Sequence, residues 1–264
     1  MTQIPQGVFS YCESLVDINL SNITDIDASA FSYCYKLTNI DLSSIVTIGQ
    51  YGFSYTGIVT LVLPSTLTSL GNACFSHTEN LTSIDLSACT LLTSLPNNCF
   101  EYTSSLSQII LPNTITTLGN SCFQNSNIAN IDISNITSLG AYCFNYCSNL
   151  TSINLNNTIS QIPNYCFYST GLTSVEIPAS VTTIASNAFN TSTLKTLILY
   201  DANVISTASS SFTTAITDIY YRGSQGKTVS DLETEYNTRY GSNNYLKPTA
   251  SRTVHYIPYE DWNV

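Results

Sequence analysis

Apolar residues recur along this chain with a period of about 22 residues. All ten phenylalanines follow it: Phe9, Phe31, Phe53, Phe75, Phe100, Phe123, Phe144, Phe167, Phe189 and Phe212. Between them lie hexamers with apolar residues at the first, fourth and sixth positions, such as Leu37-Thr-Asn-Ile40-Asp-Leu42. A fixed period of this length indicates a solenoid of stacked repeats. Each repeat is predicted to contain a strand, a turn, a second short strand or bend, and a segment that carries the phenylalanine.

The predicted repeats must bury their apolar residues against one another, because one repeat of this length cannot close a core alone. We expect the strands of successive repeats to pair in parallel, about 4.8 Å apart, with the phenylalanines lining the opposite wall. A fully buried large apolar side chain contributes about 1.5–3 kcal/mol. About ten such repeats therefore need neither disulfides nor a metal for stability.

The residue between the fourth and sixth hexamer positions is expected to point away from the core, because side chains alternate along a strand. Read along the repeats, this column is Asn19, Asp41, Val62, Asp85, Ile110, Asp132, Asn154, Glu176, Ile198 and Tyr220. Its four acids occupy alternate repeats, which keeps like charges apart and is a sufficient structural explanation. As a surface, the column is a candidate site for partner recognition, with Asn19, Asp41, Asp85, Asp132, Asn154, Glu176 and Tyr220 as its polar residues.

A column of tyrosines, one in each of six repeats, is expected two residues after the phenylalanine. These residues are Tyr11, Tyr33, Tyr55, Tyr102, Tyr146 and Tyr168, and His77 occupies the same place in its own repeat. A row of half-exposed aromatic rings is a candidate for stacking on a carbohydrate or for contact with a protein. The alternative is that the row covers the loop leading into the strand, and this structural interpretation is favoured.

Most of the nine cysteines fall into two columns. Cys74, Cys99, Cys122, Cys143 and Cys166 directly precede a phenylalanine, where other repeats have small residues such as Ala30 and Ala188. Stacked thiols at this spacing approach disulfide distance, and a soft metal is a second alternative. The odd total and the alanines at equivalent positions favour free buried thiols, which behave as small apolar groups.

The net charge is −10, and its distribution is uneven. Before residue 195 there is one base, Lys36, against ten acids, whereas from Lys195 onward there are six bases and seven acids. A chain without a basic stripe cannot displace counterions from phosphates, so nucleic-acid binding is excluded. The acidic surface is suited to solubility, to a basic protein partner or to divalent cations.

No catalytic, cofactor or metal motif is recognised. The recurring acids follow the repeat, and the sequence contains no phosphate-binding glycine loop, no Cys-x-x-Cys pair and no calcium-loop spacing. His77 is interpreted as a substitute for tyrosine, and His255 has no nucleophile or zinc ligand at a recognisable spacing. We therefore predict a protein that is not an enzyme and uses no cofactor.

The segment Phe144-Asn-Tyr-Cys147-Ser-Asn-Leu150-Thr-Ser-Ile153-Asn-Leu155 resembles the BspA-like leucine-rich repeat. So does Phe31-Ser-Tyr-Cys34-Tyr-Lys-Leu37-Thr-Asn-Ile40-Asp-Leu42, and the resemblance extends from residue 4 to about residue 221. It implies an α/β-type, right-handed leucine-rich-repeat solenoid over residues 1–221, with the parallel sheet on its concave face. It also implies a cell-surface or secreted protein that adheres to a protein or glycan of a host or of the extracellular matrix.

The period ends after Tyr221, and residues 222–264 are predicted to form a C-terminal cap. Ser230-Asp-Leu-Glu233 reads as a capping box that opens a helix, with Leu232, Tyr236 and Tyr240 on one face and Gly241 at its end. Residues 253–256 are expected to form a closing strand. Neither a signal peptide nor a membrane-spanning run is recognised, and because the chain starts partway through a repeat we expect a piece of a longer protein.

Two functions remain open. The first is a non-enzymatic interaction module that binds its partner through the concave face. The second is a structural spacer or scaffold that separates other parts of a larger protein. The unpaired cysteines also permit a cytosolic location, which a thiol count would address.

Overall fold

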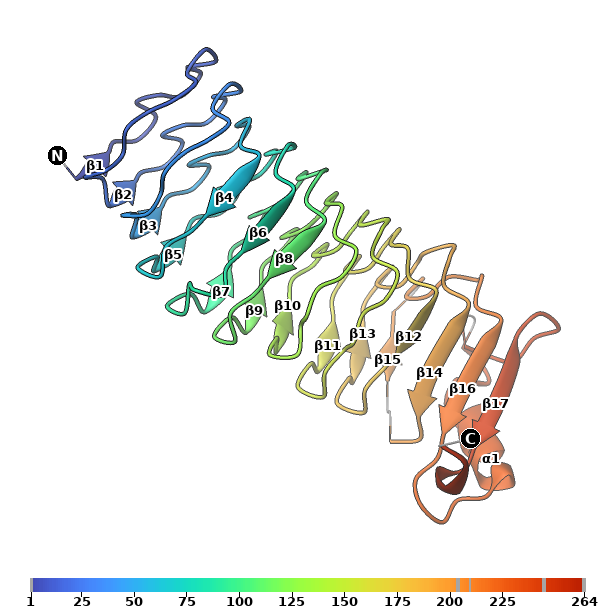
Figure 1. Cartoon of the computed structure of the whole chain (residues 1–264). Coiled ribbons are helices and arrows are strands. Elements are labelled where there is room, and N and C mark those ends of the chain that lie inside the picture. The colour runs from blue at the N-terminus through green and yellow to red at the C-terminus, as the bar shows by residue number, and fades with distance from the viewer. Residues whose placement is uncertain (1, 203–204, 209, 244–245, 263–264) are drawn as a thin grey trace.

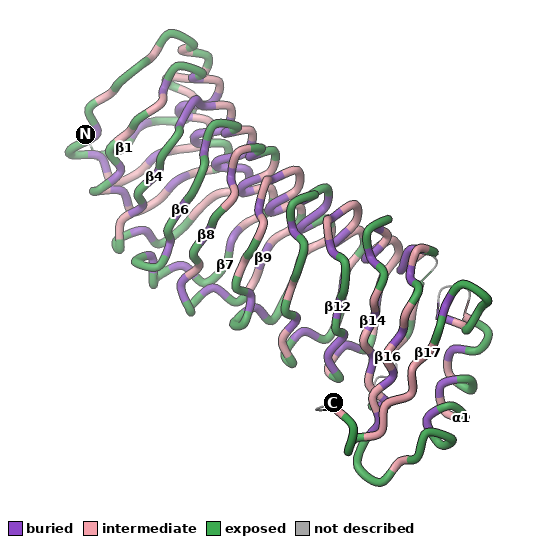
Figure 2. The backbone as a smooth tube through the Cα atoms, turned by 45° about the vertical axis from the view of Figure 1, so that its right-hand side comes forward, coloured by how far each residue is buried: buried purple, intermediate pink, exposed green. Residues whose placement is uncertain are grey.

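The computed structural model describes residues 2–202, 205–208, 210–243 and 246–262. In it the chain winds into an elongated solenoid of about ten turns, with the two ends of the chain at opposite ends of the stack (Figure 1). Buried positions recur at every turn and line the interior along the whole length (Figure 2). The predicted stack of repeats with one continuous core is therefore confirmed.

The predicted hexamers form the first wall, which we call the strand wall. Its strands are β4 (Thr60–Val62), β6 (Ser83–Asp85), β8 (Gln108–Ile110), β12 (Ser174–Glu176), β14 (Thr196–Tyr200), β16 (Asp218–Arg222) and β17 (Thr253–Ile257). They pair in parallel as two sheets, β4-β6-β8 and β12-β14-β16-β17. Equivalent residues of adjacent repeats face each other, as Ile84 faces Ile109. The predicted parallel pairing in repeat register is confirmed for these hexamers, whereas those at 15–20, 37–42, 128–133 and 150–155 follow the same wall without forming strands.

A second wall is made of two-residue strands, one in each repeat. They are β1 (Gln3–Ile4), β2 (Asp25–Ile26), β3 (Thr47–Ile48), β5 (Ser69–Leu70), β7 (Ser94–Leu95), β9 (Thr117–Leu118), β10 (Ser138–Leu139), β11 (Gln161–Ile162), β13 (Thr183–Ile184) and β15 (Ser206–Thr207). These strands also pair in parallel, in three short sheets. The turn that follows brings adjacent repeats very close: a Cβ on Gly71 would lie 2.3 Å from the backbone nitrogen of Gln50. Glycine at position 71 therefore leaves room for the backbone of the preceding repeat, whereas equivalent turns accept proline, as at Pro96 and Pro163.

The ten phenylalanines form a single file on the third wall, which we call the Phe wall. Each consecutive pair of rings is stacked, with centroids 5.1–5.8 Å apart and planes within 12° of parallel. Nine of the side chains are buried, and Phe9, in the first repeat, is partly buried. This offset stacking adds to the stabilisation that burial alone provides.

The backbone of the Phe wall is built from turns. The residue two before each phenylalanine has a positive φ, for example Tyr51 with φ 55° and Ser121 with φ 52°. A residue in the left-handed region interrupts a right-handed helix, so no helix forms there. Instead the N–H groups donate to the next repeat, as Phe31 does to the carbonyl of Gly52 at 2.8 Å and Tyr33 to Ser54 at 2.9 Å. The wall is thus a ladder of backbone hydrogen bonds between turns.

The α/β description suggested by the resemblance applies only to the C-terminal region. Among the described residues the single α-helix is α1 (Val229–Tyr240), accompanied by the 3-10 turn η1 (Tyr259–Asp261). The helix buries Leu232, Tyr236 and Tyr240, as predicted, and ends before Gly241. The expected capping box at Ser230 is wrong: Thr228 is the N-cap, and it exchanges hydrogen bonds with Asp231.

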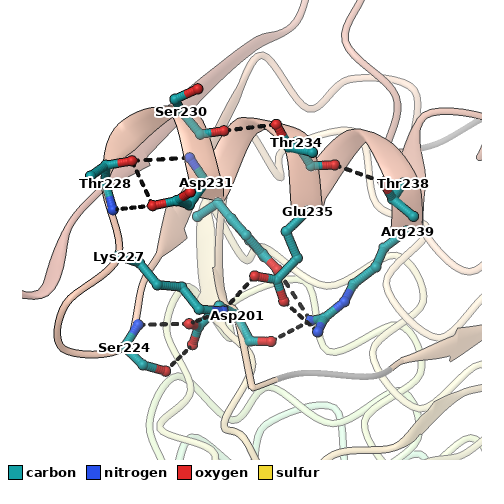
Figure 3. Close-up of polar contacts among 11 residues, drawn as sticks. Asp201, Ser224, Lys227, Thr228, Ser230, Asp231, Thr234, Glu235, Thr238 and Arg239 are labelled. Atoms are coloured by element: carbon teal, nitrogen blue, oxygen red, sulfur yellow. Dashed lines mark hydrogen bonds and ion pairs between the residues drawn. The ribbon is translucent and has the colours of Figure 1, made fainter.

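The C-terminal region continues the stack for one more strand. The predicted closing strand is confirmed, since β17 pairs in parallel with β16 and lies beside α1 in Figure 1. An ionic network fastens the helix to the last repeats (Figure 3). In it the Lys227 ammonium lies 2.9 Å from the carboxylate of Asp201, which also accepts two hydrogen bonds of 2.7 Å from Ser224. Glu235 on α1 pairs with both Lys227 and Arg239.

Candidate functional site

The predicted outward column lies on the strand wall with its side chains outside the core. We call it the strip: Asn19, Asp41, Val62, Asp85, Ile110, Asp132, Asn154, Glu176, Ile198 and Tyr220. Its first eight members are exposed, including Val62 at 81% and Ile110 at 55%, and the last two are half-buried. The structure therefore brings every candidate residue of this column into one row.

Three acids of the strip close a turn of their own backbone. The Oδ1 atoms of Asp41, Asp85 and Asp132 each accept a hydrogen bond of 2.8–2.9 Å from the N–H of the serine two residues on. These serines lower the pKa of each carboxyl, so the acids remain ionised down to lower pH than usual. Asn19 makes the same contact with Ser21 at 2.9 Å. An Asx turn, more than charge alternation, accounts for the residue types here.

Glu176 is set apart from the other acids of the strip. Its carboxylate accepts a hydrogen bond from the Tyr200 hydroxyl and lies 3.7 Å from the Arg222 guanidinium. The same guanidinium lies 5.9 Å from the ring centres of Tyr200 and Trp262. Burial, followed by the hydrogen bond to Glu176, raises the pKa of Tyr200. The repeat pattern did not point to Tyr200, Arg222 or Trp262, because none of them belongs to a column of like residues.

Shallow hollows border the strip, and three of them include its polar residues. The first measures about 510 Å³ and includes Asp17 and Asp41 in its lining. The second, of about 530 Å³, includes Asp132 and Asn154, and the third, of about 490 Å³, includes Asn154 and Glu176. Their linings mix polar side chains with the apolar residues of neighbouring strands. The surface therefore offers hydrogen-bonding groups and shallow apolar contact along most of its length.

The candidate tyrosine column forms a stack whose ring faces are covered. Tyr11, Tyr33, Tyr55, His77 and Tyr102 lie one on another, with adjacent centroids 4.1–4.5 Å apart and planes within 10° of parallel. A sugar stacks on the face of a ring, and the faces of the three inner rings are already occupied by their neighbours. The geometry favours the structural interpretation of this column over carbohydrate stacking.

Tyr146 and Tyr168 do not extend that stack. Asn125 occupies the next place after Tyr102, and Tyr146 meets Tyr168 edge-on with centroids 5.6 Å apart. Tyr168 directly follows Phe167, so its inclusion in the column is wrong. The equivalent position belongs to Ser169, which has the positive φ of 53° that marks the column. The predicted row of six tyrosines is thus a stack of four tyrosines and one histidine.

Neither histidine lies in a catalytic arrangement. Burial lowers the pKa of His77 and outweighs the opposing effects of Glu101 and Glu79, so the ring is neutral at pH 7. His255 Nε2 lies 2.9 Å from Asp218 Oδ1 and its ring stacks on Tyr220 at 4.6 Å. This His–Asp contact was not predicted. It joins β16 to β17, and its immediate function is to hold the last strands together.

All nine cysteines are free, which agrees with the favoured interpretation. The sulfurs of Cys74 and Cys99 lie 3.5 Å apart, and eight of the nine side chains are buried. Burial raises the pKa of the Cys34 thiol to about 11 and that of Cys147 to about 12. Thiols with raised pKa values are poor nucleophiles and poor metal ligands. In the described residues no group of three or more histidine, cysteine or acidic side chains is placed to hold a metal ion.

Membrane insertion was not expected from the sequence. Within the described part of the chain, none of the helical segments combines the length and apolar character needed to span a bilayer.

Comparison with solved structures finds leucine-rich repeat proteins of bacteria. A leucine rich cell surface protein from Faecalibacterium prausnitzii is 17% identical, covering 94% of this chain and 73% of that protein, with a TM-score of 0.49. A leucine-rich repeat protein from Bacteroides ovatus is 16% identical over 97% of this chain and 87% of that one, with a TM-score of 0.38. The pneumococcal vaccine antigen PcpA is 18% identical over 83% of this chain and 67% of that one, with a TM-score of 0.45. No curated protein matches the chain.

Family membership follows from the repeats themselves. The BspA type leucine rich repeat region, in six copies, matches residues 1–91 and 80–195. This span contains the first eight hexamers, nine of the ten phenylalanines of the Phe file and the Asx turns of the strip described above. The chain therefore belongs to the BspA-type leucine-rich repeat family.

Proposed function

We propose that this chain is a non-enzymatic interaction module of a cell-surface or secreted protein, and that it binds a protein or glycan partner through the strip. The observation that carries the proposal is the row of exposed groups that the backbone itself holds in place. Asp41, Asp85 and Asp132 are each fixed by a hydrogen bond from the serine two residues on. Side chains already ordered in the free protein lose less entropy on binding.

Charge supports the same surface. The acids of the strip lie in the part of the chain that has a single base, Lys36, before residue 195. A negative field along an extended surface accelerates the encounter with a basic partner. Family membership supports the proposed location, because repeats of this type are typical of surface and secreted proteins. We further propose that residues 222–264 serve as a C-terminal cap for the repeats.

The test uses Asp-to-Asn substitutions, which remove charge and keep the turn. Asn19 shows that an asparagine accepts the same hydrogen bond from the residue two positions on. We expect the triple variant Asp41→Asn, Asp85→Asn, Asp132→Asn to keep its fold and to bind about tenfold more weakly at low ionic strength, with the difference shrinking as salt is added. The wild type is first screened against an oligosaccharide array and a panel of extracellular-matrix proteins. Surface plasmon resonance then compares the wild type and the variant on the matrix proteins that bind.

A matched control separates a local effect from one of net charge. Glu13, Glu233 and Glu260 are exposed and lie outside the strip. The triple variant Glu13→Gln, Glu233→Gln, Glu260→Gln changes the net charge by the same amount and is expected to bind like the wild type. Equal weakening by both variants would contradict recognition through the strip. If no partner binds the wild type in the screen, the spacer function is the better account.

A further inference from the structure

The hollow of about 490 Å³ lies where the strip reaches the C-terminal region. Repeat residues Asn154, Asn157 and Glu176 line one part of it, and Tyr200, Ser224 and Trp262 line another. The periodic pattern accounts for Asn154 and Glu176 only. Two aromatic rings, two amides, a carboxylate and hydroxyl groups therefore converge on a site that no repeat forms alone.

The charges at this hollow are compensated within the protein. Glu176 is paired with Arg222 at 3.7 Å and accepts a hydrogen bond from Tyr200. Asp201 is paired with Lys227 at 2.9 Å and with Ser224. Two acids and two bases leave no net charge for a cationic or anionic ligand to neutralise. A neutral ligand with many hydroxyl groups suits this lining better than a charged peptide, because amides and paired ions still donate and accept hydrogen bonds.

The aromatic rings supply the apolar part of the lining. Trp262 meets Tyr200 edge-on with centroids 5.3 Å apart, and both side chains are half-buried. The indole N–H of Trp262 is buried and has no acceptor in the part of the chain that the structure describes. Small-molecule sites typically combine an apolar or aromatic lining with a few placed polar groups. A sugar ring matches this combination, since it has an apolar C–H face and a rim of hydroxyls.

We propose that this hollow binds a neutral saccharide unit of a glycan. Asn154 and Asn157 hydrogen-bond its hydroxyls, the Tyr200 and Trp262 rings contact its C–H face, and the Glu176–Arg222 pair orients its rim. The inference rests on the proposed function and names the ligand class at one end of the strip. It also separates this end of the strip, where acids and bases compensate each other, from the acidic middle, which is suited to a basic protein surface.

The single tryptophan makes the site directly observable, because Trp262 is the only one in the chain. Binding is measured as a change in intrinsic fluorescence excited at a wavelength selective for tryptophan. The probes are neutral oligosaccharides terminated by galactose, mannose or N-acetylglucosamine, with sialylated and sulfated oligosaccharides and an oligolysine peptide as charged competitors. We expect at least one neutral oligosaccharide to give a saturable change. A saturable response to the charged probes alone, or to none, would overturn the proposal.

Variants then locate the binding. Asn157 is exposed, and Asn157→Ala is expected to weaken the neutral oligosaccharide about five- to tenfold, the effect of losing one hydrogen bond. Trp262→Phe is expected to retain part of the affinity and Trp262→Ala to lose about tenfold or more, both measured by calorimetry. Tyr35→Ala, an exposed aromatic in a distant repeat, is the control and is expected to have no effect. Unchanged affinity in Asn157→Ala and Trp262→Phe, with their thermal stability intact, would place the ligand elsewhere.

The result of these oligosaccharide measurements does not depend on the test of the acidic strip. The triple variant Asp41→Asn, Asp85→Asn, Asp132→Asn leaves every residue of this hollow in place and is expected to bind the oligosaccharide like the wild type. Loss of matrix-protein binding in that variant, combined with no oligosaccharide binding in the wild type, would refute the saccharide site and leave the proposed function standing. Saturable oligosaccharide binding by the wild type, combined with unchanged matrix-protein binding in the triple variant, would confirm the saccharide site and refute the acidic strip.

Discussion

The repeats and the C-terminal region are held together by different interactions. Between repeats, like residues contact like residues: phenylalanine stacks on phenylalanine and turn backbone bonds to turn backbone. In the described residues every ion pair that includes a lysine or arginine involves a residue from Arg222 onward. A repeat can rely on its next copy, whereas the last repeat has no copy beyond it. The comparison teaches that the end of the stack is secured by lysine and arginine ion pairs, which the described contacts among the earlier repeats do without.

The largest effect is expected inside the Phe file. Phe123 is fully buried and stacks on Phe100 and Phe144. Phe123→Ala is expected to lower the free energy of unfolding by about 3–5 kcal/mol, through lost burial and the cavity left behind. Chemical denaturation measures the change. Tyr146→Ala, which truncates an exposed ring two residues after Phe144, is the control and is expected to change the value by about 0.5 kcal/mol or less.

The next effect concerns the ionic network of the C-terminal region. The side chain of Asp201 is almost fully buried and is bonded to Lys227 and Ser224. Asp201→Asn is expected to cost about 1.5–3 kcal/mol, the range for hydrogen bonds to a charged group. Calorimetric melting checks the value. Glu260→Gln, at an exposed acid of the same region, is expected to melt like the wild type.

Acid should weaken the same network. Burial would raise the pKa of Asp201, but the hydrogen bonds from Lys227 and Ser224 outweigh it, so the folded-state pKa lies below the ordinary value. This stabilisation is therefore complete above the unfolded pKa of about 3.9 and is lost as the pH falls through the lower folded value. Trp262 fluorescence, which reports on this end, should change at a higher pH than the far-ultraviolet circular dichroism of the repeats. Coincident transitions would contradict the separation of the two regions.

A smaller effect is expected at the cysteine column. Cys122 is buried, and the equivalent position is naturally alanine at Ala30 and Ala188. Cys122→Ala should cost about 0.5–1.5 kcal/mol, as for the loss of one buried methylene-sized group. A thiol assay should find nine reactive groups in denaturant and only the half-buried Cys12 in the native protein. Fewer than nine in denaturant would show that some are oxidised.

The smallest effect is expected from relieving a left-handed residue on the Phe wall. Ser121 has φ 52°, a conformation that costs most residues about 1–2 kcal/mol and glycine almost nothing. Glycine also gains freedom in the unfolded chain, so Ser121→Gly should stabilise by only about 0.5 kcal/mol. Ala129→Gly, at a position without positive φ, should instead destabilise by about 0.5–1 kcal/mol. A change of the same sign in the free energy of unfolding of both variants would argue against strain at Ser121.

Features that recur with the repeat can be predicted from the sequence, whereas features formed by residues outside the repeat pattern cannot. The Phe file, the outward strip and the buried face of α1 all follow from spacing, because periodicity determines which side of an element faces the core. The left-handed turns were missed, since residues such as Tyr51 and Tyr142 are not types that favour positive φ. The hollow at Tyr200 and Trp262 was missed because its residues are brought together from 154 to 262 by tertiary structure alone. The helix start was misplaced by two residues because Thr228 and Ser230 both resemble caps.

Hydrogen exchange with mass spectrometry tests the contrast between the two regions most directly, with the wild type, Phe123→Ala and Asp201→Asn compared under one condition. If neighbouring repeats support each other and the C-terminal region depends on its ionic network, Phe123→Ala should speed exchange mainly in residues 98–146. Asp201→Asn should speed it mainly in residues 196–257 and leave residues 31–144 protected. Equal acceleration along the whole chain in both variants would contradict this account, because it would show that one set of interactions stabilises the entire molecule.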